Sequence, residues 1–230
     1  MKIENISIDG LTVARAIKKY YPQYIELVEK QNLYNYLLLF GIRFSTCDTS
    51  LPDDFIGGIR LEQSFFTGQP YWNWMVSNGT TDPTPKYLVQ TIDKAARLAG
   101  GTAWVKEGQY IYYFYGNWQG YPAFAPKTSV QVYRWMPSYK GEKFDPKKAK
   151  LSTSIDTMIH RTWAKDRLFA DSAGCQSVKN NALLIDLARW AKTHRTMYKE
   201  NSFTYTLLTK EQFVEANKGY DKGFFFKGIF

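Results

Sequence analysis

Short strand-like segments, separated by turn residues, follow one another through most of this chain, and this succession limits its fold more than any other feature. The segments are rich in aromatic residues, which favour strands and make up 17% of the chain. They cover residues 34–44, 59–76, 105–118, 130–135 and 203–208. No helical pattern recurs between successive segments, so the alternating rhythm of a parallel α/β sheet is excluded. The sequence therefore predicts an α+β fold that is mostly β.

Turn residues mark where these segments end. Pro and Asp cluster at residues 51–54, and a Gly-Gly pair follows at 57–58. Residues 78–85 contain an Asn-Gly step, two prolines and three threonines, and are predicted to form a loop.

Apolar residues at helical spacing predict two helices near the N-terminus. Val13, Ala16 and Ile17 form one apolar stripe, and Thr12 is expected to cap that helix. Pro22 either ends it or begins the next one.

A longer helix is predicted over residues 181–194, with the asparagine at 180 or 181 as its cap. His194 would lie at its C-terminal end, where a positive charge suits the helix dipole. Residues 209–212 have the pattern of a capping box that begins a last short helix.

No internal repeat or long linker divides the chain. We expect an N-terminal helical segment at 1–33, a main domain at 34–195, and a C-terminal strand, helix and aromatic tail at 196–230. The tail contains Phe224–Phe226, which would be costly to expose and is expected to pack on the domain or on a partner.

Charge and composition narrow the possible ligands. Thirty Lys and Arg against 21 Asp and Glu give a net charge of +9, which favours polyanions such as wall polymers or nucleic acid. No nucleic-acid-binding motif is present, so a nucleic-acid partner is not expected. Only two Cys and two His occur, scattered at 47, 160, 175 and 194, so neither a metal site nor a cofactor is expected.

The chain has no feature that predicts a membrane anchor or secretion. Its longest near-apolar run, residues 37–40, is far too short to span a bilayer. Its first residues lack the apolar region and cleavage site of a signal peptide, so none is expected.

Cysteine chemistry is predicted in residues 155–178. A cysteine nucleophile needs a base within hydrogen-bond reach and N–H donors for the oxyanion that forms. The turn Ser172-Ala173-Gly174-Cys175 offers unobstructed amides, and His160 closes a strand-like segment that could lie beside it. The alternative is that Cys175 is a small buried hydrophobic residue.

This pattern, a His followed after 14 residues by Cys in Ser-x-Gly-Cys, resembles the catalytic domain of the L,D-transpeptidase (YkuD-like) superfamily. The motif Ile-His-Arg … Ser-Ala-Gly-Cys-Gln resembles that of a branch of this superfamily found in tailed bacteriophages. Four further segments extend the resemblance to about residues 35–195: 40–43, 80–83, 101–110 and 132–134.

The resemblance implies a mostly β mixed sheet or barrel that acts on peptidoglycan stem peptides through a thioester. Cys175 would be the nucleophile and His160 the general base and acid. The amides of Gly174 and Cys175 would hold the oxyanion, and Ser172 would shape the turn.

Four residues of this sequence depart from the family pattern. Ala173 replaces a second His, and Arg161 replaces a Gly after the base. Gln176 and Ser177 stand where many members carry Ile or Val and Arg or Asn. Ala173, Gln176 and Arg161 are expected to contribute to the oxyanion and substrate-binding region. Arg161 either binds a substrate carboxylate bidentately or pairs with Asp166 or Asp171.

Two functions follow as expectations. The first is a phage peptidoglycan-directed cysteine hydrolase or transpeptidase, a lysis factor or a virion component that opens the wall. The second is a structural tail or capsid protein that keeps the fold without catalysis and binds other virion proteins through its C-terminal tail. The expected location is the virion, or the host cytoplasm before lysis.

Overall fold

The computed structural model describes residues 1–44, 53–83, 87–88, 94–138, 142, 144–145, 147–161 and 173–220. Strands and helices are mixed and strands predominate, which confirms the predicted α+β class. Within these residues, eight strands close into a barrel in the order β11-β12-β5-β4-β3-β13-β7-β8.

The barrel strands are β3 (Leu38–Arg43), β4 (Asp54–Gln63), β5 (Pro70–Thr80), β7 (Gly108–Trp118), β8 (Tyr121–Pro126), β11 (Ile159–Arg161), β12 (Gln176–Val178) and β13 (Phe203–Thr209). A second sheet has the order β10-β9-β6, from β6 (Thr102–Val105), β9 (Val130–Trp135) and β10 (Lys150–Ser154). The short strands β1 (Lys2–Ile3) and β2 (Ile6–Ser7) pair with each other. The helices are α1 (Gly10–Tyr20), α2 (Pro22–Lys30), α4 (Lys94–Leu98), α5 (Asn181–Tyr198) and α6 (Lys210–Asn217).

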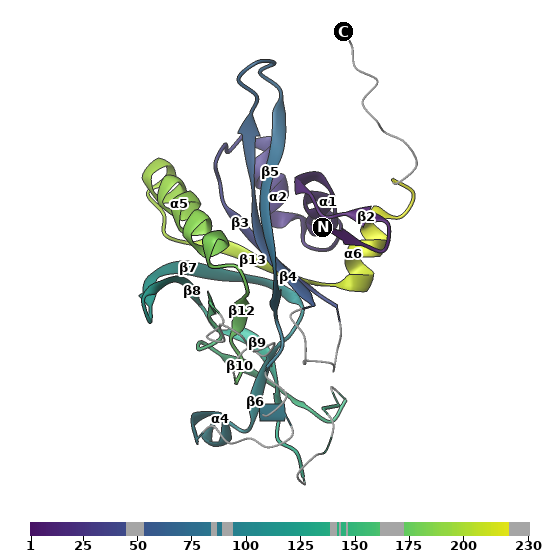
Figure 1. Cartoon of the computed structure of the whole chain (residues 1–230), viewed down its shortest axis with the longest axis vertical. Coiled ribbons are helices and arrows are strands. Elements are labelled where there is room, and N and C mark those ends of the chain that lie inside the picture. Colours follow the sequence, from purple (N-terminus) through teal and green to yellow (C-terminus); the bar gives the residue numbers. More distant parts are fainter. Residues whose placement is uncertain are drawn as a thin grey trace.

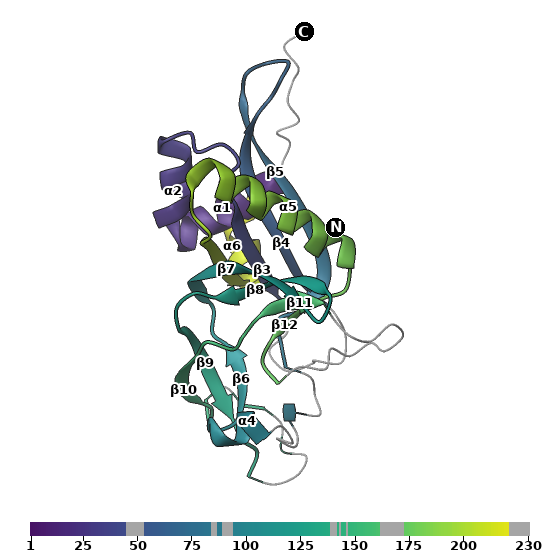
Figure 2. The same cartoon turned by 90° about the vertical axis from the view of Figure 1, so that its left-hand side faces the viewer.

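Helices cover the barrel on two sides. Helices α1, α2 and α6 lie on one side and α5 on the other, while the small sheet and α4 extend from one end (Figures 1 and 2). Strand β3 runs between the two helical layers. Its residues Leu38, Phe40 and Ile42 pack in the cluster of the N-terminal helices, whereas Leu39 packs in the cluster that contains α5. Burial on both faces explains why this strand is a continuous apolar run.

Most neighbouring barrel strands are antiparallel, but β11 and β12 are parallel, as are β3 and β13. The parallel pair β11–β12 positions two of the residues predicted to form the site. It sets the strand that carries His160 beside the strand that directly follows Cys175.

The cap of α1 differs from the prediction. Asp9, not Thr12, is the N-cap: its carboxylate accepts a hydrogen bond from Thr12 N at 2.9 Å, and Thr12 Oγ1 accepts one from Asp9 N at 3.0 Å. This reciprocal pair is a capping box, in which a carboxylate one turn earlier is the stronger cap. Pro22 begins α2, which settles the alternative left open by the sequence.

The predicted loop at 78–85 is wrong in its first part. Strand β5 continues to Thr80, because Gly79 pairs with Asp54 on one side and Thr80 pairs with Ser177 on the other. Neighbouring strands on both sides supply the hydrogen bonds that override the turn preference of these residues.

The C-terminal part of the chain completes the barrel. Strand β13 lies between β3 and β7, and the expected boundary at residue 195 falls inside α5. Residues 203–209 therefore belong to the same barrel as β3 to β12. The predicted tail from 221 onward, with Phe224–Phe226, lies outside the described residues.

Candidate active site

Cys175 lies at the wall of a small cavity. Its side chain is a partly exposed thiol that forms no disulfide within the described residues, and Sγ donates a hydrogen bond to the backbone oxygen of Asp156 at 3.3 Å. The cavity has a volume of about 150 Å³. It is lined by Ala95, Ala96, Ala99, Ala103, Arg134, Ser154, Asp156, Thr157, Ala173, Gly174 and Cys175. The predicted nucleophile is therefore accessible to a small ligand.

The turn before Cys175 requires glycine. Gly174 has φ of +151°, and a Cβ there would lie 2.8 Å from Ala103 Cβ and 3.0 Å from Ala103 O. Ala103 N also donates a hydrogen bond to Ala173 O at 3.1 Å. Strand β6 thus holds the turn from one side, and only a residue without a side chain fits at 174.

His160 is the middle residue of β11 and is buried. Ile159 pairs with Gln176, and both are buried in the barrel interior, so the alternation of side chains places His160 and its partner Ser177 on the opposite face. Cys175, two residues before Ser177, has the same parity. The backbone therefore places His160 on β11 and Cys175 directly before the neighbouring strand β12, while His160 is not among the described residues that line the cavity.

The ring of His160 is held in a state that suits a base. Nδ1 lies 2.6 Å from the backbone oxygen of Arg161, so this nitrogen carries the proton and Nε2 is left as the acceptor. Burial lowers the pKa of His160, while the hydrogen bond to Arg161 O acts in the opposite direction. The imidazole is consequently neutral at pH 7, as a general base must be.

A buried hydroxyl fixes the segment opposite Cys175. Tyr112, from β7, donates a hydrogen bond to Thr157 O at 2.8 Å. Gln176 N donates to Met158 O at 2.8 Å. These two bonds hold residues 156–158 between β7 and β12. They thereby set the position of the Asp156 carbonyl that accepts the hydrogen bond from the thiol. Burial raises the pKa of the Tyr112 hydroxyl, which keeps it protonated as a donor.

The cavity contains two charged side chains from the small sheet and its exit. Arg134 comes from the central strand β9, and Asp156 follows β10. Desolvation lowers the pKa of Arg134, and the carboxylate of Asp156 raises it. Neither residue was predicted to be part of the site, because only the pairing of β9 with β6 and β10 brings them to Cys175. Arg134 lies in the segment 132–134 quoted for the family resemblance.

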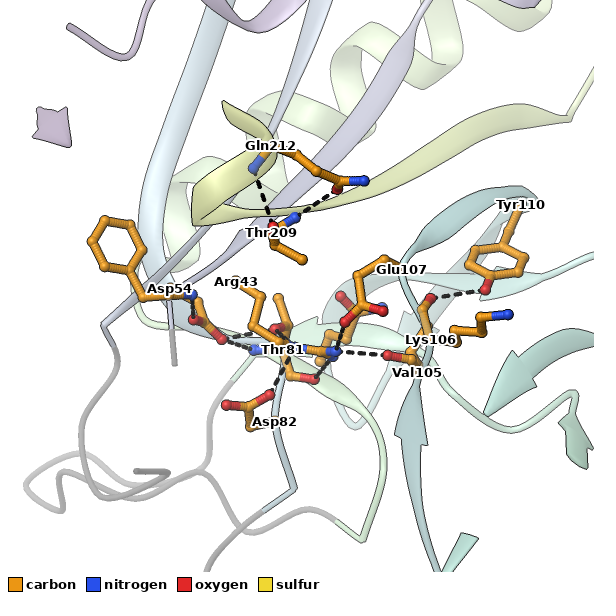
Figure 3. A network of polar contacts seen from close by, with 12 residues as sticks. Arg43, Asp54, Thr81, Asp82, Val105, Lys106, Glu107, Tyr110, Thr209 and Gln212 are labelled. Carbon is orange, nitrogen blue, oxygen red and sulfur yellow. Dashed lines mark hydrogen bonds and ion pairs between the residues drawn. The ribbon is translucent and has the colours of Figure 1, made fainter. Parts of the chain in front are cut away.

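A second set of charges, of which Arg43, Asp54 and Asp82 are buried, lies next to β6 (Figure 3). Arg43, only 2% exposed, donates hydrogen bonds to Thr81 Oγ1 at 2.9 Å, Thr81 O at 3.0 Å, Val105 O at 2.8 Å and Glu107 at 3.1 Å. Its Nε also lies 2.9 Å from Asp82 Oδ1 and forms an ion pair with that carboxylate. The Nε–H hydrogen bond itself goes to Thr81 Oγ1. Desolvation raises the pKa of Asp82 well above its usual value.

Asp54 closes this network. Its carboxylate accepts hydrogen bonds from Phe44 N and from the backbone and hydroxyl of Thr81, each at 2.7 Å. The bond from Arg43 to Val105 O joins β3 to β6, the strand whose Ala103 supports Gly174. The network therefore fixes the small sheet against the barrel and, through it, the turn that carries Cys175.

Two predicted substrate-binding residues lie elsewhere. The side chain of Gln176 is fully buried in the barrel, where it accepts a hydrogen bond from the hydroxyl of Tyr205. The guanidinium of Arg161 stacks on the ring of Tyr121, with 3.9 Å from Cζ to the ring centroid. Neither lines the cavity, whereas Ala173 and Gly174 do. Ser172, and the proposed partners Asp166 and Asp171 of Arg161, lie outside the described residues.

The predicted role of His194 at the helix dipole is wrong. His194 is fully buried, its Nδ1 accepts a hydrogen bond from Leu37 N at 3.0 Å, and burial lowers its pKa to about 4. A neutral ring that satisfies a backbone donor replaces the expected surface charge. Asn180 caps α5 as one of the two predicted candidates, by accepting a hydrogen bond from Ala182 N.

Among the described residues, no group of three His, Cys, Asp or Glu side chains is placed to hold a metal ion. Within the same part of the chain, no helix is both long and apolar enough to cross a membrane. Comparison with protein-family models, curated proteins and solved structures gives no match for this chain.

Proposed function

We propose that this chain is a phage cysteine enzyme that cleaves or exchanges peptide bonds in the stem peptides of peptidoglycan. The observation that carries the proposal is a partly exposed thiol at a cavity, on a turn that only glycine permits, beside a strand that bears a neutral buried histidine. The net charge of +9 favours contact with an acidic wall polymer.

The chemistry assigns one role to each group. His160 Nε2 takes the proton of the Cys175 thiol as Sγ attacks the carbonyl carbon of the scissile bond. The amides of Gly174 and Cys175 hold the oxyanion. The imidazolium then returns the proton to the leaving amine, which leaves a thioester on Cys175. Water, or the amine of a second stem peptide, attacks the thioester and restores the thiol.

The family resemblance supports this proposal because its segments meet around the site. Arg43 of segment 40–43 donates hydrogen bonds to Thr81 of segment 80–83 and to Val105 of segment 101–110. Ala103 and Arg134, from the two remaining segments, line the cavity with Cys175. Residues far apart in sequence that share a resemblance and converge on one cavity are expected of a site rather than of scattered surface positions.

Digestion of purified sacculi tests the proposal. The wild-type protein is expected to release or rearrange stem-peptide fragments that mass spectrometry identifies, and Cys175→Ala is expected to abolish this. Cys47→Ala, which removes the other thiol, is the matched control and should keep the activity. Failure of the wild-type protein to change the sacculi, or undiminished activity of Cys175→Ala, would contradict the proposal.

One observation favours the structural alternative, a virion protein without catalysis. The hairpin of β4 and β5 projects beyond the helices (Figure 1), and Phe65 and Phe66 at its turn are 95% and 93% exposed. Two adjacent exposed Phe side chains are costly in water and are typical of a protein contact. If this alternative holds, Phe65→Ser with Phe66→Ser should reduce co-purification with phage particles, while Cys175→Ala should not.

A further inference from the structure

We infer that Arg134 binds a carboxylate of the ligand next to Cys175, and so determines which peptides enter the cavity. The inference rests on the proposed function for the kind of ligand, a peptide, but not for its cleavage. Arg134 thereby takes the role of binding a substrate carboxylate, which the sequence had suggested for Arg161.

The position of Arg134 is fixed by the small sheet. In β9 it pairs with Ala103 on one side and with Lys150 on the other. Because paired residues point to the same face of a sheet, the Arg134 side chain lies beside Ala103, which contacts Gly174. Nη1 donates a hydrogen bond to Gly101 O at 3.2 Å. The guanidinium is therefore held at the cavity wall near the thiol.

Arg134 keeps hydrogen-bonding capacity for a ligand. A guanidinium has five N–H donors in a planar fork. Among the described residues, the one hydrogen bond that the guanidinium donates runs from Nη1 to Gly101 O. Nε is buried without a partner in this part of the chain and out of a ligand's reach, so the donors that remain for a ligand are those of the two Nη atoms. A carboxylate with two oxygens matches the fork geometry and satisfies two donors at once.

The surroundings favour an anion at this place. Partial desolvation strengthens the attraction between the guanidinium and an anionic group, compared with the same pair in water. Asp156 is exposed, so a ligand carboxylate would displace water rather than a buried partner from the guanidinium. Asp156 itself would then face the cationic or amide part of the ligand.

The size of the cavity limits the ligand further. A volume of about 150 Å³ is that of an engineered cavity that holds a benzene-sized molecule. One small residue of a peptide fits this space. Ala95, Ala96 and Ala99 of α4 form much of the wall, and their small side chains keep the space open. The volume therefore agrees with a ligand of which one residue, the one that carries the carboxylate, enters the cavity.

Two sources could supply that carboxylate: the C-terminus of the peptide or an acidic side chain. The test is calorimetric binding of short peptides that end in a D-residue to the Cys175→Ala protein, in which no cleavage occurs. Four versions of one peptide carry a free or amidated C-terminus and a free or amidated side chain. We expect at least one amidation to weaken binding about tenfold or more, because a charge-assisted bond is lost. The position of that amidation identifies the source.

Variants in the same Cys175→Ala background assign the effect to Arg134. Arg134→Met should remove the preference for the carboxylate, Arg134→Lys should restore part of it, and Arg161→Met should leave it unchanged. Thermal unfolding confirms that each variant is folded. Equal binding of all four peptides, no binding of any, or a preference that survives in Arg134→Met would overturn the inference.

The outcome is independent of catalysis. A carboxylate preference that depends on Arg134, together with intact sacculi in the digestion with the wild-type protein, would support this inference and contradict the proposed function. Cleavage that depends on Cys175, with no carboxylate preference, would do the reverse.

Discussion

Arg43 and Arg134 differ in how many of their guanidinium donors form hydrogen bonds within the protein. Arg43 is 2% exposed and directs hydrogen bonds to Thr81, Val105 and Glu107. Arg134 is half-buried, donates to Gly101 O, and has no hydrogen-bond partner for Nε among the described residues. One side chain holds two sheets together, and the other lines a cavity beside a thiol.

This difference separates structure from function. Burying a charge is costly unless neighbouring groups bond to it. The stability of the fold is therefore expected to depend on a buried arginine whose donors are all bonded within the protein. An arginine at a cavity that still has N–H donors without a protein acceptor can donate them to a ligand. The predictions that follow test this contrast, from the largest expected effect to the smallest.

Arg43→Met is expected to destabilise the protein by about 3–5 kcal/mol, because it leaves buried carboxylates without their cation. Urea denaturation measures the loss. Arg134→Met is the matched control and is expected to cost less than about 1 kcal/mol, as for most substitutions away from a buried network. Equal losses in the two variants would contradict the contrast.

Gly174→Ala is expected to cost about 3 kcal/mol, because the added Cβ lies 2.8 Å from Ala103 Cβ at a φ that L-residues rarely adopt. Thermal unfolding measures the loss, and sacculus digestion should show that activity falls even where the variant is folded. Gly100→Ala is the comparison: Gly100 also has positive φ, but a Cβ there meets nothing within 4 Å. A similar cost in both variants would mean that the contact with Ala103 is unimportant.

Stability should fall as the pH decreases from 7 to 5, because of His194. The pKa of His194 in the folded protein, about 4, lies below its ordinary value of 6.5. Between these two pH values the unfolded chain therefore binds a proton that the folded protein does not. The expected loss from this residue is about 2 kcal/mol between pH 7 and pH 5. His160, whose pKa is also lowered, adds to it in the same direction. Urea denaturation at both pH values should show a smaller difference in His194→Gln than in the wild type; an unchanged difference would exclude His194 as its source.

Tyr112→Phe is expected to cost about 1 kcal/mol, the net value of one hydrogen bond, and to loosen the segment that faces Cys175. Hydrogen exchange at residues 156–158 should increase while the rest of the barrel is unchanged. Tyr121→Phe, on the surface of β8, serves as control. Unchanged exchange at 156–158 in Tyr112→Phe would show that the hydroxyl does not hold this segment.

The sequence predicted the class of the fold and the place of most elements, because those depend on local patterns. The strand predicted at 203–208 is present as β13, and the start of α2 at Pro22 and the Asn180 cap were each one of two alternatives that residues neighbouring in the chain had suggested. The end of β5 at Thr80 was missed because its pairing partner lies about 100 residues away, in β12.

The candidate site was predicted in part, for the same reason. Cys175, His160 and Gly174 belong to one short segment and were predicted from it, and Cys175 and Gly174 line the cavity. Arg134 and Asp156 meet Cys175 only through the pairing of the small sheet, and the burial of Gln176 in the barrel follows from the parallel pairing of β11 and β12. A charged or polar residue looks the same in a sequence whether a sheet buries it or leaves it at a cavity.

The most direct test of the central claim is the rate at which Cys175 is alkylated at pH 6.5, followed by peptide mass spectrometry so that Cys47 is measured separately. If His160 acts as a general base, it takes the thiol proton as Sγ attacks, so Cys175 should react about fivefold faster than a small reference thiol, which at this pH reacts only through its small thiolate fraction. His160→Gln should remove that advantage. A Cys175 that is inert, or that reacts equally fast with and without the imidazole, would contradict the assignment of these two residues as nucleophile and base.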